Sequence, residues 1–513
     1  MTAIEYLSMS KPKRIAFKFL NFFKNIPIAI WNFLRKIPYK CGLIFEKIKV
    51  PFIILWDALV YGDWKTKLSF VIFGFGQLFH KEKIKGILMF IYEVFFIVYM
   101  IVTGAPNLAL LGNLGYIASV SYPNPDFGNI TTTQYYNNSF QIILTSVVTI
   151  VFILIFAGLF YCSARRAKEL QDLANVGKGT TDIQFLKDLG EKDFHKTLLA
   201  IPMVGLVCFT IIPIIFMILI AFTNYNTYHT FPARLFDWVG FQNFANIFSA
   251  TDVGNNLFLT TFLQVLLWTL IWAFFATFTN YFLGMIVAIL INTKGIKLKK
   301  LWRTVLVTTI AVPQFVSLLL INRMLNQDMG IINQWLLQLG WIEKGIPWLN
   351  DAVISKVVII VANTWIGIPY TMLICTGLLM NIPEDLYESA KIDGASPYKM
   401  YMKITLPYML FVTMPYLISQ FVGNINNFNV IYLLSQGNPV FTFEPGLTVP
   451  QNLNGVGQTD LLITWIYKLT MTNAFKDYGT ASVLGIMIFI VVAFFSVIFY
   501  SKSNSVQNEE DFQ

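Results

Sequence analysis

The sequence predicts an all-α, polytopic helical membrane protein with about eight transmembrane helices. Hydrophobic residues make up 56% of the 513 residues and charged residues only 13%, whereas soluble domains carry about 25% charged residues. The apolar stretches are longer than a soluble core helix needs. They also lack the short alternating segments of a transmembrane β-barrel. These observations exclude a soluble globular fold and favour a helical bundle in the membrane.

Eight apolar stretches are long enough to cross a membrane. We expect spans at 86–104, 141–163, 197–223, 258–291, 302–322, 353–381, 409–435 and 481–500. The stretch 258–291 exceeds one crossing, so it should tilt or break near Thr279 and Asn280. Residues 68–79 are apolar but too short to span, and we interpret them as an interfacial or re-entrant piece.

The distribution of basic residues predicts the orientation in the membrane. Of the 37 Lys and Arg, 31 lie in the segments that share one side when the amino terminus is cytoplasmic. Those segments are 1–85, 164–196, 292–303, 382–408 and 501–513. The sequence therefore predicts a multi-pass protein of the cell membrane with both termini in the cytoplasm.

The amino-terminal region holds most of the excess positive charge. Residues 1–67 contain twelve Lys/Arg against four Asp/Glu, and aromatic residues such as Phe17 and Phe22 interleave with the lysines. This pattern favours one or two interfacial helices on anionic membrane lipids over nucleic-acid binding. A disordered basic tail remains the alternative. No cleavable signal peptide is evident, because lysines recur and no uninterrupted apolar core is present.

No catalytic or metal site is predicted. The four cysteines are scattered, and the three histidines are too widely separated for a His/carboxylate cluster. The segment Gly177–Thr180 lacks the spacing of a phosphate-binding loop, so we expect no cofactor on this chain. Glu93 lies midway along the first span and is either a functional carboxylate or one paired or protonated inside the bundle.

A polar stretch, Glu388–Pro407, separates two apolar spans and must lie outside the hydrocarbon. Pro383 suits the start of a first short helix, and Gly394 suits the left-handed position that ends it. Ser396 then caps a second helix with Pro397 in its first position, and we expect that helix to end before Pro407. The stretch thus predicts two short helices bent at a glycine.

Polar residues in the later spans indicate a site within the membrane. Gln420, Gly423, Asn424 and Asn427 are spaced to share one face of the span 409–435. Buried amides need partners, and an amide both donates and accepts, as a hydroxyl group does. In the neighbouring span, Gly367 and Pro369 should weaken the helix and expose backbone groups to a ligand. Trp365, Tyr370 and Phe428 offer flat faces for a sugar ring. Hydrogen bonding that only joins helices remains equally open.

The polar stretch resembles the EAA loop of ABC importer permeases. The matching pattern is Glu-x-Ala-x-x-x-Gly followed, after nine residues, by Ile-x-Leu-Pro, with Ser389 where alanine is usual. The resemblance implies that the loop docks on an ATPase subunit. The implied coupling residues are Glu388, Ala390, Asp393, Gly394, Ala395, Ile404, Leu406 and Pro407.

The chain from about 197 to 500 is similar to the MalF type of maltose/maltodextrin permease. The similar stretches are 240–244, 311–313, 363–370, 388–407, 424–428 and 459–462. The resemblance implies sugar contacts at Gly367, Tyr370, Asn424 and Asn427, and we add Gln420, which stands where the family has serine. Gly423 and Ile310 replace two aromatic residues. Only residues 224–257 lie between the third and fourth spans, so the large outer domain that some Gram-negative members have there is missing. The form is therefore Gram-positive-like.

The resemblance also implies the domain organisation and the partners. We expect a basic interfacial region at 1–84, an accessory two-span module at 85–196, a six-span permease core at 197–501 and a cytoplasmic tail at 502–513. The implied partners are a MalG-type second permease, two MalK-type subunits that hold ATP and Mg²⁺, an extracellular solute-binding protein and the oligosaccharide. The alternatives are a permease for another oligosaccharide or a polyol, and an ion-coupled secondary transporter. A membrane-bound enzyme is disfavoured.

Overall fold

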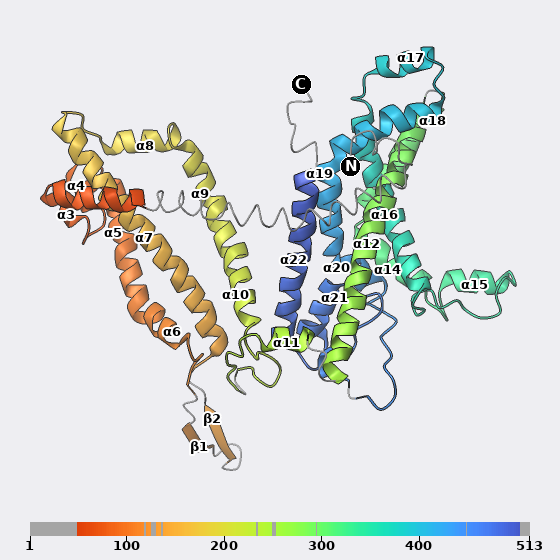
Figure 1. Ribbon diagram of the computed structural model, residues 1–513, viewed down its shortest axis with the longest axis horizontal. Helices are drawn as coiled ribbons and strands as arrows, with labels where there is room; N and C mark the ends of the chain where they lie inside the picture. Colours follow the sequence, from red (N-terminus) through yellow and green to blue (C-terminus); the bar gives the residue numbers. More distant parts are fainter. Residues whose placement is uncertain are drawn as a thin grey trace, which may run out of the picture. The chain divides into compact units, whose positions relative to one another are not determined.

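The computed structural model describes residues 49–116, 120–124, 130–134, 137–231, 234–248, 253–293, 295–447 and 449–502. The interfacial helices predicted at 1–67 therefore lie mostly outside the described residues, although 49–61 are helical. The chain divides into two compact units, one of Met1–Leu111 with Leu144–Ile212 and the other of Gly112–Ile143 with Pro213–Gln513. Figure 1 shows their helices.

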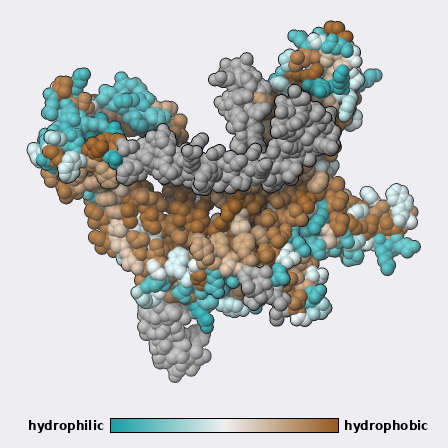
Figure 2. Space-filling view, in the orientation of Figure 1, coloured by the Kyte–Doolittle hydropathy of each residue, from teal (hydrophilic) through white to brown (hydrophobic). Residues whose placement is uncertain are grey.

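The predicted fold class is confirmed. Among the described residues, seven helices are long and apolar enough to cross a membrane, and one pair bent by 88° brings the number to eight. The seven are Lys83–Leu110, Ser139–Asn175, Phe194–Ile220, Asn256–Asn292, Ile354–Leu379, Pro397–Ile425 and Tyr478–Tyr500, and the bent pair is Lys299–Ala311 with Gln314–Met324. Hydrophobic residues cover the middle of these helices in Figure 2.

The first unit is built on two long helices, α5 (Lys83–Tyr99) and α7 (Ser139–Asn175). Phe156 of α7 packs against Phe96 and Phe73, with ring centroids 4.2 and 4.7 Å away. The remaining helices of this unit are α3 (Trp64–Leu68), α4 (Phe75–Phe79), α6 (Ala105–Leu110), α8 (Asp182–Gly190) and α9 (Phe194–Leu206).

Two buried acidic residues of the first unit have clear partners. The Glu93 carboxylate accepts a hydrogen bond of 2.8 Å from the backbone N–H of Phe73, which lies in the turn before α4. Glu82, only 1% exposed, pairs with the Arg166 guanidinium of α7. A buried polar group needs such hydrogen-bond partners, and the bond between Glu93 and Phe73 ties the segment 69–74 to α5.

The second unit holds the site described below. Its helices are α10 (Ile212–Ile220), α11 (Gln242–Phe248), α12 (Val253–Asn292), α13 (Lys299–Thr308), α14 (Gln314–Met324), α15 (Ile331–Gln338), α16 (Ile354–Leu379), α17 (Glu384–Ile392), α18 (Pro397–Met400), α19 (Leu406–Ile425), α20 (Phe428–Leu434), α21 (Leu462–Tyr467) and α22 (Tyr478–Lys502). A two-stranded antiparallel hairpin, β1 (Val120–Asn124) and β2 (Ile130–Gln134), adds the strands seen among the described residues. The core of the second unit includes the buried side chains of Trp272, Trp465 and Tyr281.

Of the two alternatives for 258–291, a tilt or a break, the break is wrong, because α12 continues without interruption. The Thr279 hydroxyl donates to the Phe275 carbonyl at 2.6 Å and the Asn280 amide to the Ala276 carbonyl at 2.9 Å. Both polar side chains thus find acceptors one turn back on their own helix, so neither one interrupts it.

The sequence also predicted that Gly367 and Pro369 would weaken the helix and expose its backbone groups, but the helix is not interrupted there. Helix α16 runs through both residues, and Pro369 is buried inside it. The hydroxyl of Thr371 donates to the carbonyl of Gly367, one turn back on the same helix, at 3.2 Å. A continuous α16 therefore packs along α12.

Candidate functional site

The polar loop has the predicted helix–turn–helix form. Helix α17 follows Pro383 and ends at Gly394, whose φ of +70° is the left-handed conformation that glycine favours. The N–H of Ala395 donates to the Ala390 carbonyl at 2.8 Å, and the N–H of Gly394 donates to Lys391 at 3.0 Å. This pair of bonds is a Schellman motif. The hydroxyl of Ser396 then caps α18 by accepting from the N–H of Lys399.

The second loop helix does not end before Pro407, contrary to the prediction. Helix α18 continues through a π-helical turn, Tyr401–Thr405, into α19, in which Pro407 occupies the first turn. In the π turn the N–H of Leu406 reaches the Tyr401 carbonyl, five residues back. Proline lacks an N–H and crowds the carbonyl four residues before it. A wider turn just before Pro407 relieves that crowding, so the helix passes into the membrane unbroken.

The loop presents an exposed surface away from the membrane helices. Ile392 is 87% exposed and Tyr398 73% exposed, both beside the turn at Gly394. Of the predicted coupling residues, Glu388, Asp393, Gly394 and Pro407 are exposed, whereas Ala390, Ala395, Ile404 and Leu406 are half-buried. The hydroxyls of Tyr387 and Thr405 lie 2.8 Å apart and join the two arms of the loop. The loop is thus a compact helix–turn–helix, held together by the Tyr387–Thr405 contact, with exposed apolar residues at its turn.

All five predicted substrate residues line one cavity of about 640 Å³. Gly367 and Tyr370 come from α16, Gln420 and Asn424 from α19, and Asn427 from the start of α20. The opposite wall includes Ile310, Pro313 and Ser317 of the bent pair. None of the described residues that line this cavity is charged. The arrangement suits a neutral ligand that exchanges hydrogen bonds with amides.

Asn427 does not share a helix face with Gln420 and Asn424, as the sequence pattern suggested. Helix α19 ends at Ile425, and Asn427 caps α20 by accepting from the N–H of Val430. Its side-chain amide donates to Oδ1 of Asn424 at 3.2 Å, which still brings the two side chains together at the cavity. The Asn424 amide also donates to the Thr277 hydroxyl at 3.0 Å. Gly423 and Phe428 are not among the lining residues, and Phe428 stacks on Tyr432.

Two lining amides have buried atoms without a hydrogen-bond partner in the described part of the chain. These atoms are Oδ1 of Asn280, on α12, and Nδ2 of Asn363, on α16. An unsatisfied buried polar atom is unfavourable by about 1–3 kcal/mol, so it needs a physical reason. Sequence reasoning did not name Asn280 as a site residue, because it considered Asn280 only as a place where the long span could break.

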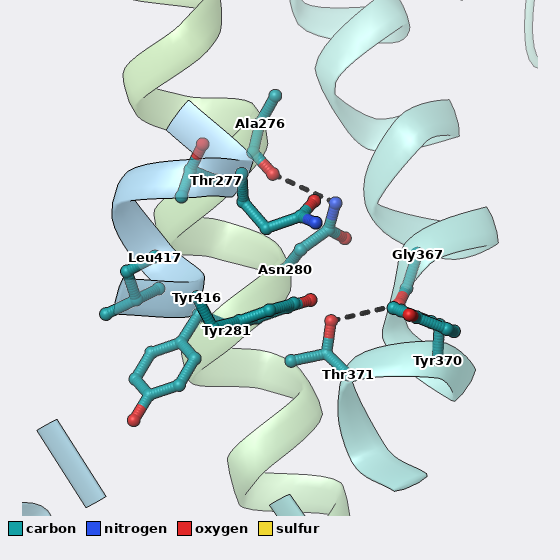
Figure 3. A pocket seen from close by; sticks show the side chains of 10 residues that line it. Ala276, Thr277, Asn280, Tyr281, Gly367, Tyr370, Thr371, Tyr416 and Leu417 are labelled. Atoms are coloured by element: carbon teal, nitrogen blue, oxygen red, sulfur yellow. Dashed lines mark hydrogen bonds between the residues drawn. The ribbon is translucent and has the colours of Figure 1, made fainter. Parts of the chain in front are cut away.

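Asn280 and Gly367 lie at a close approach of α12 and α16 (Figure 3). A Cβ atom on Gly367 would lie 2.5 Å from Nδ2 of Asn280 and 2.7 Å from its Oδ1. A small hollow of about 60 Å³ beside them is lined also by Tyr281, Thr371 and Tyr416. Gly367 is therefore needed for helix packing as well as for lining the cavity.

The segment that carries the Thr459–Leu462 similarity forms a buried ion pair at the end of the unit away from the loop. The Asp460 carboxylate, fully buried, accepts from Lys468 at 2.7 Å and from the N–H of Gly457 at 2.7 Å. Burial raises the pKa of Asp460, while the Lys468 ammonium opposes that shift. Oδ1 of Asp460 would lie 2.2 Å from a Cβ on Gly437, so this segment requires glycine there. The pair fixes the connection between α20 and α21.

Comparison with known proteins places this arrangement among transport proteins. Residues 280–504 match the family described as binding-protein-dependent transport system inner membrane component. The galactooligosaccharides transport system permease protein GanP of Bacillus subtilis is 33% identical over 449 residues, covering 86% of this chain and 97% of that protein. The maltodextrin transport system permease protein MdxF of the same species is 34% identical, covering 87% and 97%. The Escherichia coli maltose/maltodextrin transport system permease protein MalF is 34% identical over 260 residues, 50% of this chain and 48% of that protein.

Proposed function

The chain belongs to the family of binding-protein-dependent transport inner membrane components, in its MalF-type branch, and we propose that it forms half of the pathway of an ATP-driven importer for neutral oligosaccharides. The observation that carries this proposal is the uncharged, amide-lined cavity between α12, α16, α19 and the bent pair. Sugar hydroxyls both donate and accept, so they match amide groups at several positions at once.

The names of the relatives narrow the substrate class. GanP is named for galactooligosaccharides and MdxF for maltodextrin, and both are chains of neutral hexoses. We propose a maltodextrin-type oligosaccharide as the first substrate to test. Ile310 and Gly423 leave the site poorer in aromatic platforms than the family pattern, so another neutral oligosaccharide or a polyol is an outcome that the test must distinguish.

The unpartnered amide atoms support ligand binding in this cavity. Nδ2 of Asn363 and Oδ1 of Asn280 are a donor and an acceptor that are covered within the cavity wall, and sugar hydroxyls would reach them once these side chains turn toward the cavity. A bound sugar would remove the penalty of leaving these atoms unsatisfied. Tyr370, 52% exposed, offers its ring at the same cavity. Gln420, Asn424 and Asn427 would contribute the remaining polar contacts.

The braced loop is proposed as the docking surface for an ATP-binding subunit. Its exposed Ile392 and Tyr398 form an apolar tip that a protein partner would cover. A groove of about 460 Å³ beside the loop is lined by Glu388, Lys391 and Tyr387 and also by Asn292 at the end of α12. Hydrolysis would take place on that subunit, which holds ATP and Mg²⁺, and this chain would not act as an enzyme.

The remaining partners follow from the same proposal. A second permease of the MalG type would close the cavity, two ATP-binding subunits would dock on the two loops, and a solute-binding protein would deliver the sugar outside. The membrane orientation is the one that the basic residues predict, with both termini and the loop in the cytoplasm. In this orientation ATP-driven movement of the loop would reach the cavity from its cytoplasmic side.

The experiment is ATP-dependent uptake of labelled maltotetraose by the complete importer in proteoliposomes. In Asn363→Ala, which removes a donor that has no partner within the chain, KM should rise about fivefold, the loss of one hydrogen bond. Thermal stability should not fall, because no internal bond is lost. Gln338→Ala serves as the control, since Gln338 is exposed on α15 and is not among the residues that line this cavity.

Competition by unlabelled galactooligosaccharides, maltodextrins and polyols in the same assay ranks the substrate class. An unchanged KM in Asn363→Ala would contradict the proposal that the sugar binds in this cavity during transport. Uptake that continues without ATP but stops when the proton gradient collapses would instead favour an ion-coupled transporter.

A further inference from the structure

A second cavity in this unit, of about 620 Å³, has a different character from the amide-lined one. It lies at the end of α12 and α16 remote from the coupling loop, and the segment 441–443 closes one side. Lys356 is the charged residue among those that line it, and the polar uncharged ones are Thr260, Thr261, Gln264, Thr442 and Gln458. Neither the family nor the proposed transport pathway accounts for it.

Lys356 has no carboxylate partner within the described part of the chain. It lies in the first turn of α16, and its ammonium sits 5.2 Å above the ring of Trp268. Trp268 is only 5% exposed, and its indole N–H donates to the Thr459 carbonyl at 3.1 Å. A lysine near the end of a span usually extends into water, whereas this one lies over a fixed aromatic ring. The cation is thus held at the cavity with its charge uncompensated.

One face of α12 continues from this cavity toward the middle of the membrane. Thr260, Gln264, Leu267, Ile271 and Phe274 are spaced by three or four residues, and all are exposed. Leu267 is 60% exposed and Phe274 50%. The face is polar next to Lys356 and apolar farther along. It leads to a hollow of about 660 Å³ whose walls include Phe275, Phe278 and Phe282.

We propose that this face binds an anionic phospholipid. The phosphate would lie at Lys356, the glycerol and ester region at Thr260 and Gln264, and an acyl chain along Leu267, Ile271 and Phe274. From Gln264 to Phe278 the helix rises about 21 Å at ~1.5 Å per residue, which exceeds the ~15 Å of one hydrocarbon leaflet. In the proposed orientation the lipid belongs to the outer leaflet.

The order of groups along α12 favours a lipid over the other occupants. A free anion such as phosphate would use Lys356 but not the apolar stripe. A protein partner would not need polar groups at one end and apolar ones at the other, in the sequence in which a lipid presents its headgroup and chains. The positive charge in a polar patch above an apolar stripe is the complement of an anionic lipid.

The test places the complete importer complex in phosphatidylcholine nanodiscs that contain a small fraction of phosphatidylglycerol with a photoactivatable acyl chain. After irradiation, mass spectrometry of the digested chain locates the lipid label. In the wild type the label should concentrate on α12 between Leu257 and Leu283. Lys356→Gln should lower that labelling about fivefold, the effect of one basic residue near an anionic headgroup.

Two further variants separate a lipid site from general damage. Lys356→Arg keeps the charge and should label as the wild type does. Lys344→Gln removes an exposed lysine of the same outer region and should also leave labelling unchanged. A wild-type chain without enriched label on α12, or equal labelling in Lys356→Gln, would overturn the proposal. So would a photocrosslinker at position 267 that joins the second permease, because protein would then cover the stripe.

Discussion

Gly367 offers the sharpest test of how the cavity is built, because two functions compete at that position. A methyl group in Gly367→Ala would lie 2.5 Å from Nδ2 and 2.7 Å from Cγ of Asn280, against a comfortable separation of about 3.5–4.0 Å. The Asn280 side chain must therefore move by about 1 Å, although its amide is bonded to the Ala276 carbonyl. Overpacking of this kind destabilises by about 1–3 kcal/mol.

Gly377→Ala is a matched control on the same helix. Nothing lies within 4 Å of a Cβ at Gly377, and both glycines are inside α16. Each substitution gains the same helix propensity, up to about 1 kcal/mol, so the gain cancels in the comparison. The difference between the two variants should therefore be the clash alone, with Gly367→Ala about 1–3 kcal/mol less stable.

The assay is unfolding of the purified complex in one detergent, followed by intrinsic fluorescence, together with uptake in proteoliposomes. Asn280→Ala removes the obstructing amide, so the double variant Asn280→Ala with Gly367→Ala should recover most of the lost stability. Equal stability of Gly367→Ala and Gly377→Ala would refute the close approach of α12 and α16. Failure of the double variant to recover would show that the strain lies elsewhere than at Asn280.

Two further predictions concern the loop and the buried ion pair. Gly394→Pro should leave the complex assembled but reduce ATP-dependent uptake more than tenfold. Proline forces φ near −65° where the structure has +70°, and it removes the N–H that donates to the Lys391 carbonyl. Unchanged uptake would contradict the coupling role. Lys468→Met should destabilise the chain by about 3–5 kcal/mol in the same unfolding assay, since it leaves the buried Asp460 unpaired. Lys476→Met, with no buried acidic partner among the described residues, should change stability by less than about 0.5 kcal/mol.

The parts of the fold that depend on local chemistry could be predicted from the sequence. Apolar length located the spans, and Gly394 and Ser396 located the turn and the cap of the loop, because these residues act within a few positions of themselves. The same reasoning placed Gln420, Asn424 and Asn427 at one cavity. It gave the wrong reason for Asn427, since helical spacing cannot reveal that α19 ends two residues earlier.

The errors share a physical cause. Pro407 was expected to end a helix, Pro369 to weaken one, and the Thr279–Asn280 pair to mark a break unless the span tilted. The π turn at Tyr401–Thr405 accommodates Pro407, and the side chains of Thr279 and Asn280 bond to carbonyls one turn back on α12. In the membrane an unsatisfied backbone group is so unfavourable that the helix continues wherever any such partner exists.

The continuity at Pro407 changes how the proposed coupling would work. Because α18 and α19 form one helix, Pro397–Ile425, a single element of 29 residues joins the loop to the cavity. At ~1.5 Å per residue it is about 43 Å long. One end carries the cap at Ser396, and the other carries Gln420 and Asn424. Pro407 and Pro415 each lack the N–H of a helical hydrogen bond, yet the helix continues through both, so under the proposed coupling a displacement of the loop would be carried to these two amides. A helix that ended at Pro407 would absorb that displacement before it reached the proposed ligand site.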